Sequence, residues 1–385
     1  MSDAISRMRI EVPEEVLDDL RRRLAAARFP DQIPGSGWGY GTDGAYLREL
    51  CGYWRDKFDW RAQEARLNGF EHYHTNVDGQ KLHFVHARSK VADALPLVIT
   101  HGWPGSVFEF HKIIGPLVDP VAHGGSPRDA FHVVCPSIPG SGFSGPTREP
   151  GWDVRRVAET FAKLMARLGY PRYGAQGGDW GAIITTQLAL ADPAHVAGIH
   201  LNMVVAGAPP GAANPMEGVS AEEMKGLADM GAFVKNETGY QQIQGTKPQT
   251  LAYGLSDSPT GLAAWIVEKF RSWSDCGGDV EKRFSKDELL TNIMIYWASE
   301  TINSSMRLYC ETMRSGRFGV SSERVMTPTG CSIFPKELYR PPRRWAEAHY
   351  NVVQWTTHAS GGHFAALEEP AALVEDVRSL FRKVR

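Results

Sequence analysis

The sequence has little of what marks disulfide-rich, membrane-spanning or nucleic-acid-binding proteins. Its five cysteines are odd in number, lie far apart and form no Cys-x-x-Cys pair, which argues against a disulfide framework or a cysteine zinc site and fits a reducing compartment. No stretch approaches the ~18 consecutive apolar residues of a membrane span, and the charged N-terminus is unlike a signal peptide. Lys and Arg (42) nearly balance Asp and Glu (44), so we expect neither nucleic acid nor an anionic membrane as a partner. These features predict a soluble, cytoplasmic protein.

What the chain does have is length and an ordinary globular composition. Its 385 residues, 42% of them apolar and 22% charged, exclude wholesale disorder and can bury a large core. That length exceeds the need of one compact α/β core and suggests two units or one domain with insertions.

Hydrophobic periodicity divides the chain into four segments. Residues 1–80 contain two amphipathic helical patterns (13–28 and 45–58) and read as an N-terminal helical extension. In residues 81–205, short β-rich runs such as PLVIT and FHVVCPS come to alternate with helical patterns, which predicts a mostly parallel sheet covered on both faces. Residues 206–320 are mainly helical and interrupt that alternation as a lid, and residues 321–385 resume it. The expected fold is α/β.

The segment GGDWG (177–181) lies between the strand-like run YGAQ and the helical pattern AIITTQLALA. Small residues around a central reactive one, between strand and helix, are typical of a nucleophile elbow. The central residue here is Asp179. On this segment alone, a plain strand-to-helix turn with Asp179 as helix N-cap explains the pattern equally well.

Two later motifs favour catalysis. His363 lies in GGHF after the last strand-like run, and Glu337 lies in FPKEL, 26 residues earlier. The order nucleophile, acid, histidine is that of the α/β-hydrolases. We therefore predict an α/β-hydrolase fold with a triad of Asp179, Glu337 and His363.

An aspartate at the elbow restricts the chemistry. A carboxylate attacks an sp3 carbon to give an alkyl-enzyme ester, and water activated by His363, itself oriented by Glu337, then hydrolyses that ester. The oxyanion needs donors, for which the candidates are the backbone N–H groups of Trp180, directly after the nucleophile, and Trp103 in HGWPG. We expect both tryptophans to contact substrate as well.

Two reactions suit an aspartate elbow, namely dehalogenation and epoxide opening. A halide needs only N–H donors, whereas an epoxide oxygen needs a proton from a weak acid such as tyrosine. The lid offers Tyr240, Tyr296 and Tyr309 besides Tyr253, and composition does not choose among them. A haloalkane dehalogenase is thus the alternative, and a catalytically silent ligand-binding α/β-hydrolase is a weaker one.

The chain resembles the epoxide hydrolases, within them the microsomal-type branch and its soluble bacterial relatives. The matching segments are HGWPGS, FHVVCPSIPGSGFSG, GGDWGA, ETGYQQIQGTKPQTLAYGLSDSPTGLAAWIVEKF, NIMIYW, FPKEL and GGHFAALEEP. This resemblance implies Asp179 as nucleophile, Glu337 as acid, His363 as base, and Tyr240 with Tyr309 as the ring-opening pair. It also implies roles in detoxification or secondary metabolism, enediyne biosynthesis included. The aromatic residues of the lid predict that the epoxide, which reacts with water, is lipophilic.

No cofactor is expected for this reaction. The histidines around residues 72–86 have no acidic or cysteine partner at a helpful spacing, so no metal site is predicted either. The sequence leaves open which epoxide is used, the selectivity of its opening, and the oligomeric state, for which a homodimer is one alternative.

Overall fold

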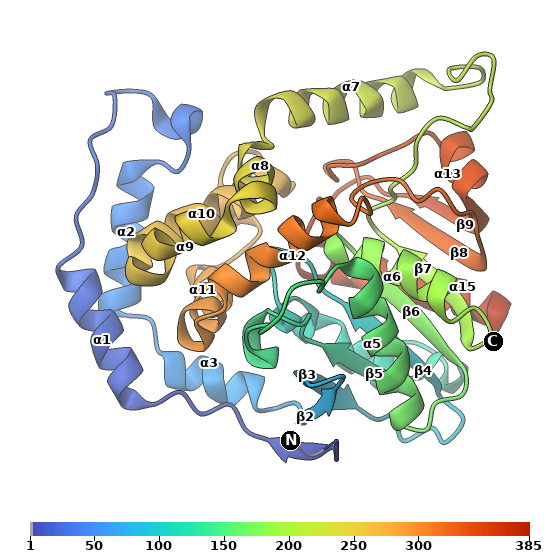
Figure 1. The fold of residues 1–385 in the computed structure, drawn as a ribbon, viewed down its shortest axis with the longest axis horizontal. Coiled ribbons are helices and arrows are strands. Elements are labelled where there is room, and N and C mark those ends of the chain that lie inside the picture. Colours follow the sequence, from blue (N-terminus) through green and yellow to red (C-terminus); the bar gives the residue numbers. More distant parts are fainter. Residues whose placement is uncertain (1–2) are drawn as a thin grey trace.

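The structure, a computed structural model, describes residues 3–385 and is built on one nine-stranded sheet (Figure 1). The strand order is β1-β2-β3-β5-β4-β6-β7-β8-β9. The first pairs, β1–β2, β2–β3 and β3–β5, are antiparallel, and the strands from β5 to β9 run parallel. The strands are β1 (Ser6–Met8), β2 (His72–Val77), β3 (Gln80–Ala87), β4 (Leu95–Thr100), β5 (Phe131–Pro136), β6 (Tyr173–Gly177), β7 (Val196–Leu201), β8 (Val325–Ile333) and β9 (Tyr350–Thr357).

Helices cover the two faces of the sheet. Further helices form the N-terminal part of the chain and the insertion between β7 and β8 (Figure 1). Several begin at a side-chain cap that satisfies a free backbone N–H, as where Asp153 accepts a hydrogen bond from the N–H of Arg156. The α-helices are α1 (Glu14–Ala25), α2 (Gly44–Asp56), α3 (Trp60–Leu67), α4 (Ile114–Val118), α5 (Val154–Arg167), α6 (Trp180–Ala191), α7 (Ala221–Asn236), α8 (Gly239–Thr246), α9 (Pro248–Asp257), α10 (Pro259–Trp273), α11 (Lys286–Ser299), α12 (Ile302–Arg314), α13 (Arg343–His349), α14 (Ala365–Glu368) and α15 (Pro370–Val384).

Alternation along the strands separates two apolar layers. In β4, Val98 belongs to the layer that contains α5 and α6, whereas Leu97 and Ile99 belong to the layer that contains α15. All three side chains are fully buried, as expected for a central parallel strand that has helices on both faces. The sheet thus forms a rigid platform, and its carboxyl-terminal edge lies under the inserted helices.

The N-terminal helices pack against the insertion. Helices α1 and α2 contact α10, and α2 and α3 contact α11, with the Tyr53 hydroxyl donating a hydrogen bond to Asp287 at 2.9 Å. Figure 1 shows these segments, distant in sequence, side by side. The segment expected to be a helical extension also contributes β1 and β2 to the sheet. The insertion is therefore supported from the side by the first part of the chain.

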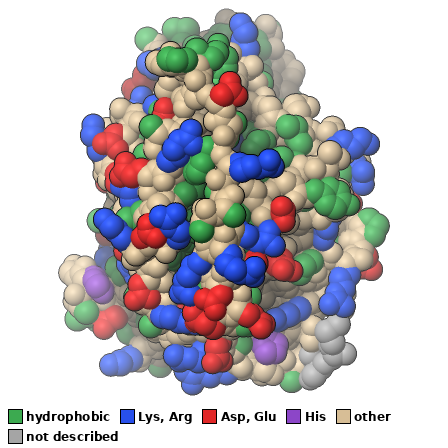
Figure 2. Space-filling view, turned by 90° about the vertical axis from the view of Figure 1, so that its left-hand side faces the viewer, with side chains coloured by type: hydrophobic (Ala, Val, Ile, Leu, Met, Phe, Trp, Pro, Cys, Tyr) green, Lys and Arg blue, Asp and Glu red, His purple; other side chains and the backbone are tan. Residues whose placement is uncertain are grey.

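The outer surface matches the near-neutral composition. Basic and acidic side chains are interspersed on the face shown in Figure 2. Within residues 3–385, every helix is too short or too polar to cross a lipid bilayer.

Candidate active site

Asp179 lies at a sharp turn between β6 and α6. Its backbone has φ +52° and ψ −130°, and its side chain makes no capping hydrogen bond to the helix, so the plain N-cap explanation does not describe this residue. A Cβ on Gly177 would lie 2.1 Å from the carbonyl oxygen of Gly181, and one on Gly181 would lie 1.9 Å from that of Thr100. Glycine at both positions is thus a steric requirement of the turn that lifts Asp179 above the sheet.

Strand register brings a second loop to Asp179. Thr100 at the end of β4 pairs with Gly177 at the end of β6, so the residues that follow both strands leave the sheet together. The backbone N–H of Trp103 donates a hydrogen bond of 2.8 Å to Oδ1 of Asp179, and the peptide bond between Trp103 and Pro104 is cis. The other predicted donor, the N–H of Trp180, is the first of α6 and directly follows Asp179.

His363 and Glu337 complete the group from the far end of the chain. The Nδ1–H of His363 lies 2.7 Å from Oε1 of Glu337, and its Nε2 lies 3.2 Å from Oδ2 of Asp179. The backbone N–H of His363 donates a hydrogen bond of 3.0 Å to the carbonyl oxygen of Trp273 in the insertion. Asp179, Glu337 and His363 are thus brought into one chain of contacts, and the two oxygens of Asp179 have different partners.

The charges around His363 decide its protonation. Burial by itself would lower the pKa of His363, but the charge of Glu337 and the hydrogen bonds with Asp179 and Glu337 outweigh it and hold this pKa well above its usual value. These neighbours therefore favour the protonated form of the imidazole.

The tyrosines of the insertion separate into two groups. Tyr240 and Tyr309 are buried, with ring centres 5.9 Å apart, and line a cavity together with Asp179. Burial and the charge of Asp179 raise the pKa of both phenols well above the usual value, so both are neutral donors at physiological pH. Tyr296 instead donates its hydroxyl hydrogen to the Gly105 carbonyl at 2.6 Å, and Tyr253 is exposed.

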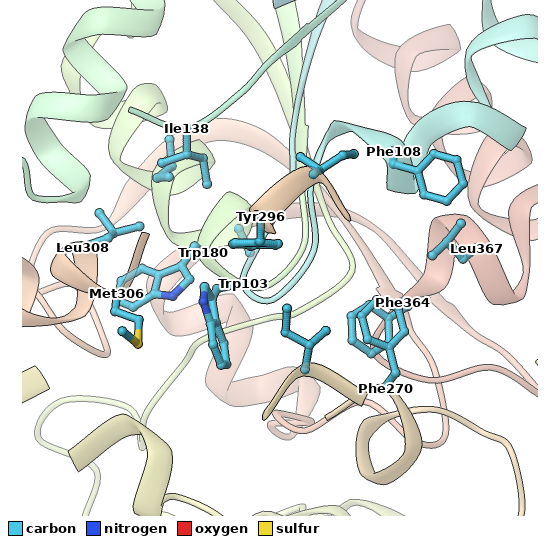
Figure 3. Close-up of a cluster of buried hydrophobic side chains, with 14 of the residues drawn as sticks. Trp103, Phe108, Ile138, Trp180, Phe270, Tyr296, Met306, Leu308, Phe364 and Leu367 are labelled. Atoms are coloured by element: carbon cyan, nitrogen blue, oxygen red, sulfur yellow. The ribbon is translucent and has the colours of Figure 1, made fainter. Parts of the chain in front are cut away.

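The two tryptophans support this pair of phenols. The Trp103 ring stacks on Tyr240 with centroids 5.4 Å apart, and the Trp180 ring meets Tyr309 edge-on at 4.5 Å. Figure 3 shows Trp103, Trp180 and Tyr296 in one buried cluster. The Trp103 ring also meets Tyr309 edge-on, with centroids 5.8 Å apart. Because both indoles pack on the tyrosines, the loops that carry the backbone donors also fix the orientation of the phenols.

The cavity above Asp179 is small and mostly apolar. It holds about 50 Å³ and is bounded by Asp179, the two tyrosines and apolar side chains. Those apolar side chains include Ile183, Met203, Phe318 and Leu338. Such walls suit the carbon skeleton of a lipophilic molecule whose polar atom faces the phenols.

A second, smaller space behind Asp179 contains a group that sequence reasoning missed. Glu109, in the short 3₁₀ helix Val107–Lys112 that follows HGWPG, lines a space of about 20 Å³ with Asp179 and His363. This space has room for about one water molecule. Burial raises the pKa of Glu109 to about 8, against the opposing charge of His363. The only signal in the sequence was a glutamate within an apolar run, VFEF.

Comparison with known proteins agrees with this geometry. The family model for the N terminus of epoxide hydrolases matches residues 5–110, and that for the alpha/beta hydrolase fold matches residues 96–251. Epoxide hydrolase 1 of Sus scrofa is 38% identical over 98% of this chain and 88% of its own length. The chain belongs to the epoxide hydrolase family. A Stigmatella aurantiaca protein with the provisional name epoxide hydrolase is 48% identical over 99% of the chain and 86% of its own length.

Solved structures of the same family share the whole architecture. The juvenile hormone epoxide hydrolase of Bombyx mori has a TM-score of 0.92 at 33% identity, covering 100% of this chain and 95% of its own. The Aspergillus niger epoxide hydrolase has a TM-score of 0.88 at 33% identity, with 100% and 97% covered. The family and the α/β-hydrolase fold predicted from the sequence are thereby confirmed.

Proposed function

We propose that this chain converts a lipophilic epoxide to a vicinal diol in two steps, through an ester on Asp179. The observation that carries this proposal is the unequal pairing of the Asp179 oxygens. Oδ1 accepts from the Trp103 N–H, whereas Oδ2 lies at His363, in a cavity that the two lid phenols also line. Asp179 thus lies between the cavity that the acid donors line and the space that His363 lines.

In the first step, Oδ2 of Asp179 attacks a ring carbon while Tyr240 and Tyr309 hydrogen-bond to the departing oxygen. An unassisted alkoxide is a poor leaving group, and a positioned acid contributes typically ~10²–10⁴-fold. Both phenols are neutral at physiological pH because burial raises their pKa. A haloalkane dehalogenase would not need them, which favours the epoxide.

In the second step, water attacks the ester carbonyl with His363 as base. Once Asp179 is esterified it no longer carries the charge and hydrogen bond that help to raise the pKa of His363, so the imidazolium can release its proton and then accept one from water. The tetrahedral oxyanion receives hydrogen bonds from the N–H groups of Trp103 and Trp180. Glu337 holds the imidazole in the required orientation.

We also propose that residues 206–320 act as a lid on a core made of residues 81–205 and 321–385, with residues 1–80 as a supporting extension. The lid supplies Tyr240 and Tyr309, whereas the core supplies Asp179.

All five cysteines are buried as free thiols, which supports a reducing compartment such as the cytoplasm as the place of action.

The deciding experiment is a single turnover in ¹⁸O-labelled water with styrene oxide and excess enzyme. Label should enter the Asp179 carboxylate and be absent from the first diol released, because water attacks the ester carbonyl. Asp179→Ala should abolish diol formation. Label found directly in the first diol, or near-normal turnover by Asp179→Ala, would replace the covalent mechanism by direct attack of water. Halide release from a haloalkane without any diol from the epoxide would favour a dehalogenase.

A further inference from the structure

Gln241 directly follows Tyr240 in α8 and is buried with it. Its side-chain Nε2 lies 2.9 Å from the Tyr240 hydroxyl oxygen. An amide NH₂ group donates hydrogen bonds and accepts none, so the phenol oxygen is the acceptor in this contact. The O–H of Tyr240 must then point away from Gln241, which leaves it available to the cavity that Tyr240 lines with Asp179.

The amide of Gln241 also has a hydrogen-bond partner on the core side of the cavity. It hydrogen-bonds with Tyr339, which lies two residues after Glu337 and lines the same cavity. An NH₂ group has two hydrogens, so it can donate one hydrogen bond to each phenol oxygen at the same time. Gln241 is therefore fixed between a lid tyrosine and a core tyrosine.

A cation lies against the same phenol ring. Lys269 of α10 is buried, and its Nζ lies 4.7 Å from the centre of the Tyr240 ring while it is ion-paired with Glu268. An ammonium group over an aromatic face is attracted by its electron density, and the attraction grows when the ring carries negative charge. Lys269 would thus favour a phenolate at Tyr240.

The second phenol is placed differently. Tyr309 is packed edge-on by the Trp180 ring, and its hydrogen bond with Tyr240 lowers the pKa of Tyr240 while raising its own. The two tyrosines are thus unequal, although the reaction scheme treats them as a pair.

We propose that Gln241 is a positioning residue that directs the O–H of Tyr240 to the epoxide oxygen and makes Tyr240, rather than Tyr309, the proton donor. This inference rests on the proposed function. As the Asp179–carbon bond forms and the ring C–O bond breaks, the Tyr240 proton passes to the oxygen and leaves a phenolate, which Gln241 and Lys269 stabilise. The proton that His363 releases after esterification of Asp179 restores the phenol, so no external proton is consumed.

The test is a double-mutant cycle on the alkylation step, followed by stopped-flow tryptophan fluorescence with styrene oxide. Gln241→Leu should slow alkylation about 10- to 100-fold, as expected for loss of a hydrogen bond to a developing charge, and leave hydrolysis of the ester unchanged. In a Tyr240→Phe background the same substitution should have no further effect, whereas in Tyr309→Phe it should keep its full effect. Gln242→Leu, an exposed neighbour, is the matched control and should behave as wild type.

A leaving-group comparison separates proton donation from packing. With 1,2-epoxypropane and its trifluoromethyl analogue, whose alkoxide needs less help, the loss in Gln241→Leu should shrink for the fluorinated substrate. Gln241→Met, which keeps the chain length, serves if the leucine variant is unstable. Equal alkylation rates in wild type and both variants, or a Gln241 effect of the same size with and without the Tyr240 hydroxyl, would overturn the inference. An unchanged rate in Tyr240→Phe alone would instead refute the proposed role of the tyrosine.

Discussion

Glu109 is a largely buried carboxyl group beside the charges of Asp179 and His363. Its pKa is raised from 4.5 to about 8 by burial. A group whose pKa is higher in the folded state stabilises the fold fully below its unfolded-state pKa, and this contribution is lost as pH rises through the folded-state value. We therefore expect Glu109 to make the free energy of unfolding fall between about pH 4.5 and pH 8.

Glu109→Gln should remove this part of the pH dependence. Urea unfolding at pH 5.5 and pH 8.5 should show a smaller difference in unfolding free energy for the variant than for wild type, by as much as a few kcal/mol, at about 1.36 kcal/mol per pKa unit. Glu323→Gln, at an exposed position, should leave the difference unchanged. If the unfolding free energy differed between the two pH values by the same amount in wild type and in Glu109→Gln, Glu109 would be ionised in the folded state.

Glu337 acts only through His363 in the proposed scheme. Glu337→Gln removes the charge that most strongly raises the pKa of His363 and replaces the carboxylate that orients its ring by a neutral amide. The pKa of His363 should fall, and ester hydrolysis should slow by roughly 10²-fold or more. Intact-protein mass spectrometry during turnover should then reveal an accumulating adduct. Slowed alkylation without an adduct would contradict this division of roles.

At the scale of elements, the turn between β6 and α6 depends on the absence of side chains. Gly181→Ala would place a Cβ 1.9 Å from the Thr100 carbonyl oxygen, and backbone can move only by displacing β4 from α6. The expected loss is about 1–3 kcal/mol of unfolding free energy or more, with loss of diol formation because the Trp103 loop follows β4.

Gly254→Ala is the control for this substitution. Gly254 lies in α9, and a Cβ there meets no atom within 4 Å. Thermal unfolding should show a gain of about 0.4–1 kcal/mol with activity retained. A stable and active Gly181→Ala variant would show that α6 and β4 can separate freely.

The elements also show what sequence patterns can predict. Asp179, His363 and Glu337 could be found because each motif is local and lies directly after a strand, and parallel strands place their carboxyl ends at one edge. The choice of Tyr240 and Tyr309 over Tyr296 required a family resemblance. Tyr296 lies on α11, where residues 289–296 are all buried, so periodicity cannot say which of the buried residues meets the cavity. Strand β2 was not predicted because its sequence, HYHTNV, has few apolar residues. Its place in the sheet depends on pairing with β3.

At the scale of the whole molecule, the N-terminal helices hold the lid from the side. Leu50 of α2 is fully buried in the core cluster that continues into the lid. Leu50→Ala should lower the unfolding free energy by about 2–5 kcal/mol, and amide exchange in α10 should become faster. Ile33→Ala, at a site 59% exposed, should change stability by less than about 0.5 kcal/mol. Unchanged exchange in α10 would show that the lid does not depend on this packing.

The division of labour between core and lid also determines the shape of the product. The carboxylate of Asp179 enters the cavity from the core, and the phenols of Tyr240 and Tyr309 enter it from the lid. A substrate held between them is attacked on one side while its oxygen is retained on the other, so the attacked carbon inverts its configuration. Cyclohexene oxide, a cis-fused ring, should give only the trans-1,2-diol, which chiral gas chromatography can resolve, and a cis-diol would require attack from the lid side.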